Sequence, residues 1–166
     1  RAIDTQPRQL VEVLKRARAH HGASFVEVFQ NCVVFNDGVF DEFTDKSVAP
    51  DAQLHVEHGK PLVFGKDQNL GLRLKPQALE LEVAKIGENG VTERDIFVHD
   101  ETNHTLASLL VSLQPPAFPV ALGVIYCNPT PSYEAEVYAQ PAGASTGRGP
   151  GDVNAPAPQV SGTSSA

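Results

Sequence analysis

Apolar and polar side chains in the first 22 residues alternate with the period of a helix. The apolar positions of this stretch are Leu10, Val11, Val13, Leu14 and Ala17. Such spacing is typical of an amphipathic helix. Thr5 is the expected N-cap, Pro7 suits the first turn, and Gly22 suits the left-handed residue that follows a helix. We therefore predict a helix over residues 7–21.

The next segment, residues 24–29, is almost continuously apolar. Its apolar members are Phe25, Val26, Val28 and Phe29. Runs of this kind are typical of strands that helices cover on both faces. A helix, a Gly turn and a buried strand make half of a βαβ unit, whose partner strands we do not find elsewhere in the sequence. The pattern predicts an α/β fold.

Cys32 follows this predicted strand at its C-terminal end. In open α/β sheets the crevice beyond the carboxyl ends of the strands is where ligands bind. Cys32 is therefore a candidate contact for iron or a cofactor. The alternative is a buried free thiol that behaves as a small hydrophobic side chain, which is commoner across proteins.

Shorter elements are predicted after Cys32. Asn36-Asp37-Gly38 indicates a turn, and residues 39–45 a short helical turn. A period of two then runs through residues 53–83, with leucines and valines alternating with charged side chains. We expect residues 53–83 to form an antiparallel appendage with one buried face and one wet face.

Two more helices and a strand are predicted toward the C-terminus. Asp100 or Thr102 is the expected cap of a helix that Pro115-Pro116 stops. Residues 119–126 predict a short apolar strand, and Ser132 is the expected cap of a last helix that runs to Gln140. Residues 141–166 are rich in Gly, Ala, Ser and Pro, and this composition predicts a disordered tail.

Composition and charge argue against some classes of function. The chain has 166 residues and a formal net charge of -7, which argues against a nucleic-acid binder because phosphate contacts need clustered Lys and Arg. There is no run of apolar residues long enough to span a membrane and no signal-peptide pattern, so we expect a cytoplasmic protein without membrane contact. Cys32 and Cys127 lie far apart, which makes a disulfide a poor first expectation. The sequence contains no Met and opens inside the run-up to a helix, as a piece of a longer protein would.

Several segments, in their order along the chain, resemble the C-terminal part of the β subunit of 2-oxoacid:ferredoxin oxidoreductases, particularly the 2-oxoglutarate type. The resemblance covers about residues 1–140. The segments that carry it are Ser24-Phe-Val-Glu-Val-Phe-Gln-Asn-Cys32, Phe35-Asn-Asp-Gly38, His58-Gly-Lys-Pro-Leu62 with Phe64-Gly65, Pro119-Val-Ala-Leu-Gly-Val124 and Pro131-Ser-Tyr-Glu134.

The resemblance implies an enzyme subunit that binds thiamine diphosphate with Mg²⁺ and holds one 4Fe-4S cluster. It matches Cys32 to the last of four cysteine ligands of that cluster. The implied reaction is the coenzyme A-dependent oxidative decarboxylation of a 2-oxoacid, with electrons passing to ferredoxin, and the implied partner is an α subunit. The three earlier cysteines and the Gly-Asp-Gly motif of the family do not occur in this sequence. The fragment alone is therefore expected to be inactive, without catalytic or cofactor-binding residues other than the metal ligand Cys32.

The resemblance also implies the fold in more detail. Residues 1–45 correspond to the end of a doubly wound thiamine diphosphate-binding domain and residues 46–140 to a mixed α+β C-terminal extension, whereas the tail, residues 141–166, falls outside the resemblance.

Asn31 lies next to the candidate ligand Cys32 and has two interpretations. It can hydrogen-bond a cluster sulfur, or it can satisfy hydrogen-bonding groups of its own loop. Cys127 is interpreted as a packing or surface thiol, and no His is assigned to a metal because none has zinc-protease spacing. His20 and His21 are expected to favour the end of the first helix by charge. An alternative function is a non-catalytic α+β module that docks another protein through residues 53–83.

Overall fold

The computed structural model describes residues 1–78 and 80–145, and the chain divides into two compact units, Arg1–Thr130 and Pro131–Ala166. Parallel and antiparallel strand pairs occur together with helices, which confirms the α/β prediction. The predicted boundaries at residues 45 and 140 stay predictions. Most of the predicted tail, residues 146–166, lies outside the described residues.

The N-terminal helix α1 (Pro7–Ala19) forms where the apolar spacing predicts it, with Pro7 in its first turn. The predicted cap Thr5 is wrong: the cap position is Gln6, which makes no side-chain cap bond. The helix also ends earlier than predicted, at Ala19, where the Ser24 hydroxyl donates to the carbonyl oxygen of Ala17 over 3.0 Å. That hydroxyl satisfies one of the carbonyls that a helix end leaves open.

Strands β1 (Ala2–Ile3) and β2 (Val28–Phe29) pair in parallel. Since β1 precedes α1 and β2 follows it in the sequence, the three elements form a small βαβ unit. The expectation that no partner strand is present is therefore wrong. The predicted buried strand over residues 24–29 is also wrong in length and burial. β1 offers only two residues for pairing, and Phe25 is 92% exposed.

The two short helices α2 (Asp41–Thr44) and α3 (Ala49–Ala52) lead into β3 (Gln53–Val56), which pairs in parallel with β7 (Val120–Gly123). The short helical turn predicted after Cys32 is confirmed by α2. Helix α4 (His104–Ser112) lies between the two strands in sequence and stops before Pro115, as predicted. Its cap is neither of the two predicted residues: the side chain of Asn103 accepts from the Leu106 N–H over 3.0 Å.

A three-stranded antiparallel sheet follows β3 and contains β4 (Val63–Phe64), β5 (Leu70–Leu74) and β6 (Leu81–Lys85). The 3-10 helix η1 (Glu93–Asp95) comes after it. The antiparallel appendage is thus confirmed for β4 to β6 and wrong for residues 53–56. β3 lacks the one-wet-face pattern, because Gln53, Leu54 and Val56 are all buried, and its partner is the apolar strand β7.

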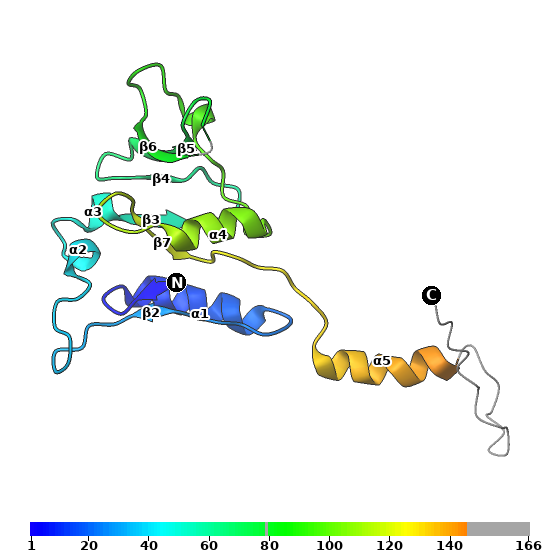
Figure 1. Cartoon of the computed structure of the whole chain (residues 1–166). Helices are drawn as coiled ribbons and strands as arrows, with labels where there is room; N and C mark the ends of the chain where they lie inside the picture. Colours follow the sequence, from blue (N-terminus) through cyan, green and yellow to red (C-terminus); the bar gives the residue numbers. More distant parts are fainter. Residues whose placement is uncertain (79, 146–166) are drawn as a thin grey trace, which may run out of the picture. The chain divides into compact units, whose positions relative to one another are not determined.

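β7 lies beside β3 and α4 (Figure 1). Its side chains are divided between two apolar clusters. Val120 and Leu122 pack with Ile3 and Phe43, whereas Ala121 belongs to the larger cluster. This division follows from the alternation of side chains along a strand. The larger cluster includes Leu54, Leu62, Phe64, Leu72, Ile96, Leu106 and Leu110.

The second unit contains helix α5 (Tyr133–Ser145). The Ser132 hydroxyl accepts from the Ala135 N–H over 3.2 Å, which confirms the predicted cap. The helix continues beyond the predicted end at Gln140. Across the described parts of the chain, no helix combines the length and apolar character that crossing a membrane requires.

Candidate functional site: the Cys32 loop

Residues 30–38 form an exposed loop between β2 and α2, which we call the Cys32 loop. The Asn36 N–H donates to the Cys32 carbonyl oxygen over 2.9 Å and closes a turn. The predicted turn at Asn36-Asp37-Gly38 is confirmed, and Gly38 adopts a left-handed φ of 73°. The loop therefore folds back on itself around the cysteine.

The thiol of Cys32 is free and exposed. Backbone N–H groups of Phe35, then of Val34 and Asn36, hydrogen-bond its sulfur and lower its pKa. Successive N–H groups that converge on one point form a concavity that favours an anion. The loop thus favours the thiolate, which is the form of cysteine that binds metals and reacts with electrophiles.

Asn31 holds the loop closed. Its amide nitrogen donates to the Asp37 carboxylate over 2.8 Å, and its amide oxygen accepts from the Gly38 N–H over 3.0 Å. Of the two interpretations of Asn31, the side chain therefore follows the second and satisfies its own loop. Its effect on Cys32 is indirect, because it joins the two ends of the segment that supplies the three N–H donors.

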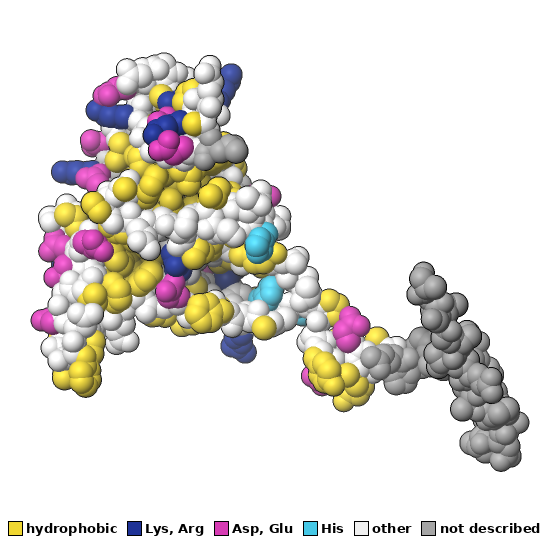
Figure 2. Space-filling model, in the orientation of Figure 1, with side chains coloured by type: hydrophobic (Ala, Val, Ile, Leu, Met, Phe, Trp, Pro, Cys, Tyr) yellow, Lys and Arg dark blue, Asp and Glu magenta, His cyan; other side chains and the backbone are white. Residues whose placement is uncertain are grey.

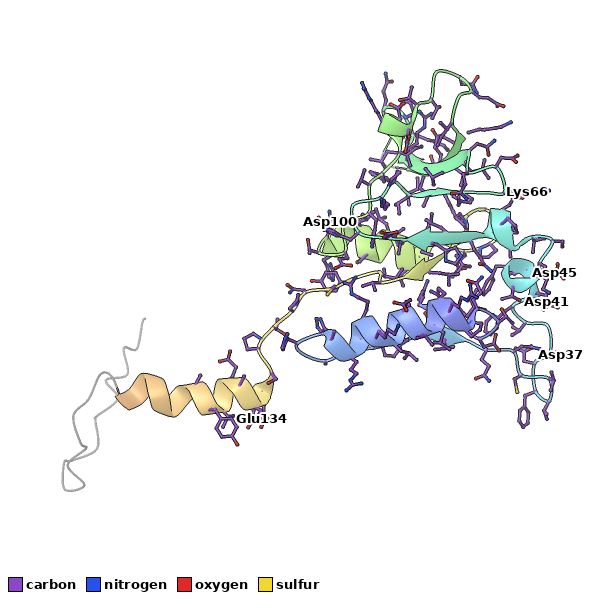
Figure 3. All side chains as sticks on the ribbon, turned by 180° about the vertical axis from the view of Figure 1, so that it is seen from behind. Asp37, Asp41, Asp45, Lys66, Asp100 and Glu134 are labelled. Atoms are coloured by element: carbon purple, nitrogen blue, oxygen red, sulfur yellow. The ribbon has the colours of Figure 1, made fainter. Side chains whose placement is uncertain are left out.

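Exposed apolar side chains follow Cys32 in the loop. Phe35 is 90% exposed, and Val33 and Val34 are exposed as well. Figure 2 shows hydrophobic side chains at the tip of this loop. Carboxylates lie on its flank, and Figure 3 labels three of them, Asp37 in the loop and Asp41 and Asp45 at α2. An exposed Phe ring beside two exposed Val side chains forms an apolar surface of the kind that another surface often covers.

The loop has the chemistry of a single metal ligand. A 4Fe-4S cluster takes about four thiolates, and within the described residues no three His, Cys, Asp or Glu side chains come together as a metal site. Cys32 alone could supply one such ligand, because its sulfur is accessible and its pKa is lowered; a cluster would need its other ligands from residues outside those described.

The sequence pattern did not reveal a second thiol environment. Cys127 Sγ lies 3.5 Å from Nδ1 of His20, and both line a pocket of about 750 Å³. The sequence interpretation of Cys127 as a plain packing or surface thiol misses this contact. No local signal announces it, because the two residues are 107 positions apart.

Comparison with known proteins supports the resemblance. The chain is 41% identical over 100 residues to the 2-oxoglutarate oxidoreductase subunit KorB of Mycobacterium tuberculosis, and the match covers 60% of this chain. The chain spans 26% of the length of that relative. The predicted resemblance to a 2-oxoglutarate oxidoreductase subunit is thereby confirmed. No protein-family model matches the chain. No solved structure matches it.

Proposed function

We propose that this chain is the C-terminal part of the β subunit of a cytoplasmic 2-oxoglutarate:ferredoxin oxidoreductase. In this proposal Cys32 supplies one thiolate to a 4Fe-4S cluster, and residues outside this chain supply the other three. The chain has no activity alone. The observation that carries the proposal is the 41% identity over 100 residues to the KorB subunit. The exposed position of Cys32 and the lowered pKa of its thiol support it.

The Cys32 loop contributes binding and tuning. Its N–H groups lower the pKa of Cys32, which favours metal binding because a metal ligand must give up its proton first. Hydrogen bonds to a ligating sulfur also help to set the reduction potential of an iron-sulfur centre. Asn31 keeps these donors in position through its two hydrogen bonds.

When bound, thiamine diphosphate with Mg²⁺ would supply an electron sink for decarboxylation, and a 4Fe-4S cluster, with Cys32 as one of its ligands, would supply one-electron transfer. The remaining partners in the proposal are the α subunit, ferredoxin, coenzyme A and the 2-oxoacid. The exposed Phe35 supports it, since an exposed apolar side chain is commonly covered by a partner surface in an assembled enzyme.

Replacing Cys32 by Ser in the complete subunit tests the proposal. A serine hydroxyl does not replace a thiolate ligand well, so Cys32→Ser should lose most of the thiolate-to-iron absorbance at roughly 400 nm together with its iron content. Cys127→Ser is the matched control and should keep both. Full absorbance and iron in Cys32→Ser would refute the role of Cys32.

The substrate is tested on the complete enzyme. Turnover with 2-oxoglutarate, measured beside turnover with pyruvate, should favour 2-oxoglutarate, as the name of the relative suggests. A preference for pyruvate would reject the substrate assignment and leave the role of Cys32 in place.

A further inference from the structure

The pocket beside Cys127 lies among four segments of the first unit: α1, residues 23–27, α4 and residues 123–128 after β7. Its volume of about 750 Å³ is in the range of small-molecule sites. Its apolar wall is made by Val13, Ala17, Phe25, Val26, Ala107, Val111 and Ile125. Polar groups line the remainder, so the pocket combines an apolar wall with a polar rim.

Cys127 is held at this rim by its backbone. Its N–H donates to the Glu101 carbonyl oxygen over 2.7 Å. The side chain of Glu101 in turn accepts from Arg16 over 2.7 Å. The half-buried thiol is therefore fixed beside α1 with its sulfur at the pocket.

Two basic side chains of α1 and its end flank the sulfur. His20 Nδ1 lies 3.5 Å away. Arg16 has a raised pKa, chiefly because of its hydrogen bond to Glu101 and to a smaller extent because of the Cys127 side chain. An imidazole nitrogen at this distance can accept the proton of a thiol when the sulfur attacks an electrophile.

We propose that Cys127 is a thiol–disulfide exchange site, at which a low-molecular-weight disulfide enters the pocket and forms a mixed disulfide with this chain. His20 takes the thiol proton, and the Cys127 sulfur bonds to one sulfur of the ligand. The disulfide bond of the ligand breaks, and its second sulfur leaves with the electron pair and receives the proton from His20. One thiol and one disulfide thus become one mixed disulfide and one new thiol.

The pocket gives this site a selectivity that Cys32 lacks. Cys32 stands on an exposed loop, so reagents of any size reach it, whereas Cys127 receives reagents through a bounded space. The proposal rests on this geometry and not on the proposed function, so either stands if the other fails.

The experiment uses the full chain with Cys32→Ser, glutathione disulfide as the probe and mass spectrometry to follow the adduct. We expect a glutathione adduct on Cys127 at neutral pH. His20→Asn should slow its formation by about threefold or more, because the proton acceptor beside the attacking sulfur is lost. The neighbouring exposed His21, which does not line the pocket, gives the matched control His21→Asn with an unchanged rate. No adduct, or equal slowing in both variants, would overturn the proposal.

A second pair of variants tests the pocket without touching the basic residues. Val111 is half-exposed and lines the pocket, so Val111→Trp should fill the space and slow glutathione disulfide. The same variant should leave the rate of the small reagent iodoacetamide at Cys127 unchanged. Val11→Trp, at an equally exposed position of α1 outside the pocket, is the control. If Val111→Trp and Val11→Trp react alike with glutathione disulfide, the pocket has no role and the proposal fails.

Discussion

The Cys32 loop and the antiparallel sheet differ in how far they expose a Phe side chain. Phe35 in the loop is 90% exposed, whereas Phe64 in β4 is 3% exposed and belongs to the main apolar cluster. Both lie in short apolar runs of similar composition. The difference is that the sheet shares the larger apolar cluster with residues of β3, α4 and β7, whereas no residue of the loop belongs to either cluster. Figure 1 shows the loop between β2 and α2 extending away from the helices and strands.

This contrast separates apolar side chains that stabilise the chain by packing within it from apolar side chains that are left exposed. Burial of apolar area in the main cluster is the dominant favourable contribution to folding. Phe35 of the loop contributes little of this kind within the chain, because its ring stays in water.

The largest expected effect comes from truncating one Phe in each region. Phe64→Ala removes a buried ring and leaves a cavity, so the free energy of unfolding should fall by about 3–5 kcal/mol. Phe35→Ala removes an exposed ring and should change it by less than about 0.5 kcal/mol. Urea unfolding of the full chain measures both. Similar losses in the two variants would show that Phe35 is packed and would remove the contrast.

A smaller effect is expected from adding a methyl group to a glycine of the packed region. Gly123 at the end of β7 has a φ of 120°, and an added Cβ would lie 2.6 Å from the Val56 carbonyl oxygen of the paired strand. Gly123→Ala should therefore lower the free energy of unfolding by about 2 kcal/mol or more, since backbone atoms must move.

Gly59 provides the matched position. Its φ is 78°, and an added Cβ meets no atom within 4 Å. Gly59→Ala should cost only the strain of a left-handed residue, about 1 kcal/mol. Equal losses in thermal or urea unfolding would mean that the β3–β7 pair relaxes freely and is not tightly packed.

Local patterns predicted the parts of the fold that depend on local contacts. The alternation in residues 70–74 and 81–83 predicts β5 and β6, which pair with each other across a short turn. The apolar spacing predicts α1 and α4 equally well. These elements form where the sequence indicates because their periodicity decides which face is buried.

Local patterns do not predict pairings between distant segments. Because residues 53–56 precede β4 closely in the sequence, the pattern predicts that they join the antiparallel appendage, but as β3 they pair with the distant strand β7. Caps were also misassigned where several candidates stand close together. Asp100 accepts from the N–H of Thr102 over 2.9 Å and forms a local turn, so the cap of α4 passes to Asn103.

The candidate site likewise has features that the sequence predicts and features that it does not. The sequence predicts the position of Cys32 after a strand and before an Asn-Asp-Gly turn. The three N–H groups that stabilise its thiolate depend on the shape of the turn and leave no signature in residue types, because any residue except Pro supplies an N–H. The contact between His20 and Cys127 depends on the tertiary fold alone.

The smallest expected effect concerns the Cys32 loop itself, and it tests whether an exposed loop is nonetheless ordered. Asn31→Ala removes the two hydrogen bonds that join the ends of the loop. The N–H donors of residues 34–36 then converge less often on the sulfur, and the pKa of Cys32, which these donors lower, should rise toward that of an ordinary thiol. Less thiolate is then present at neutral pH. Gln30→Ala, at the exposed neighbouring position, should leave the pKa where it is.

The ultraviolet absorbance of the thiolate during a pH titration measures this shift in a Cys127→Ser background. The sign is fixed by the charge: hydrogen bonds to the thiolate favour deprotonation, so weakening them moves the titration to higher pH. A titration that is identical in Asn31→Ala and Gln30→Ala would show that the turn closed by Asn36 holds the donors without help from Asn31. The order of the loop would then arise from its backbone alone, and the Asn31 side chain would be as dispensable within this chain as the exposed ring of Phe35.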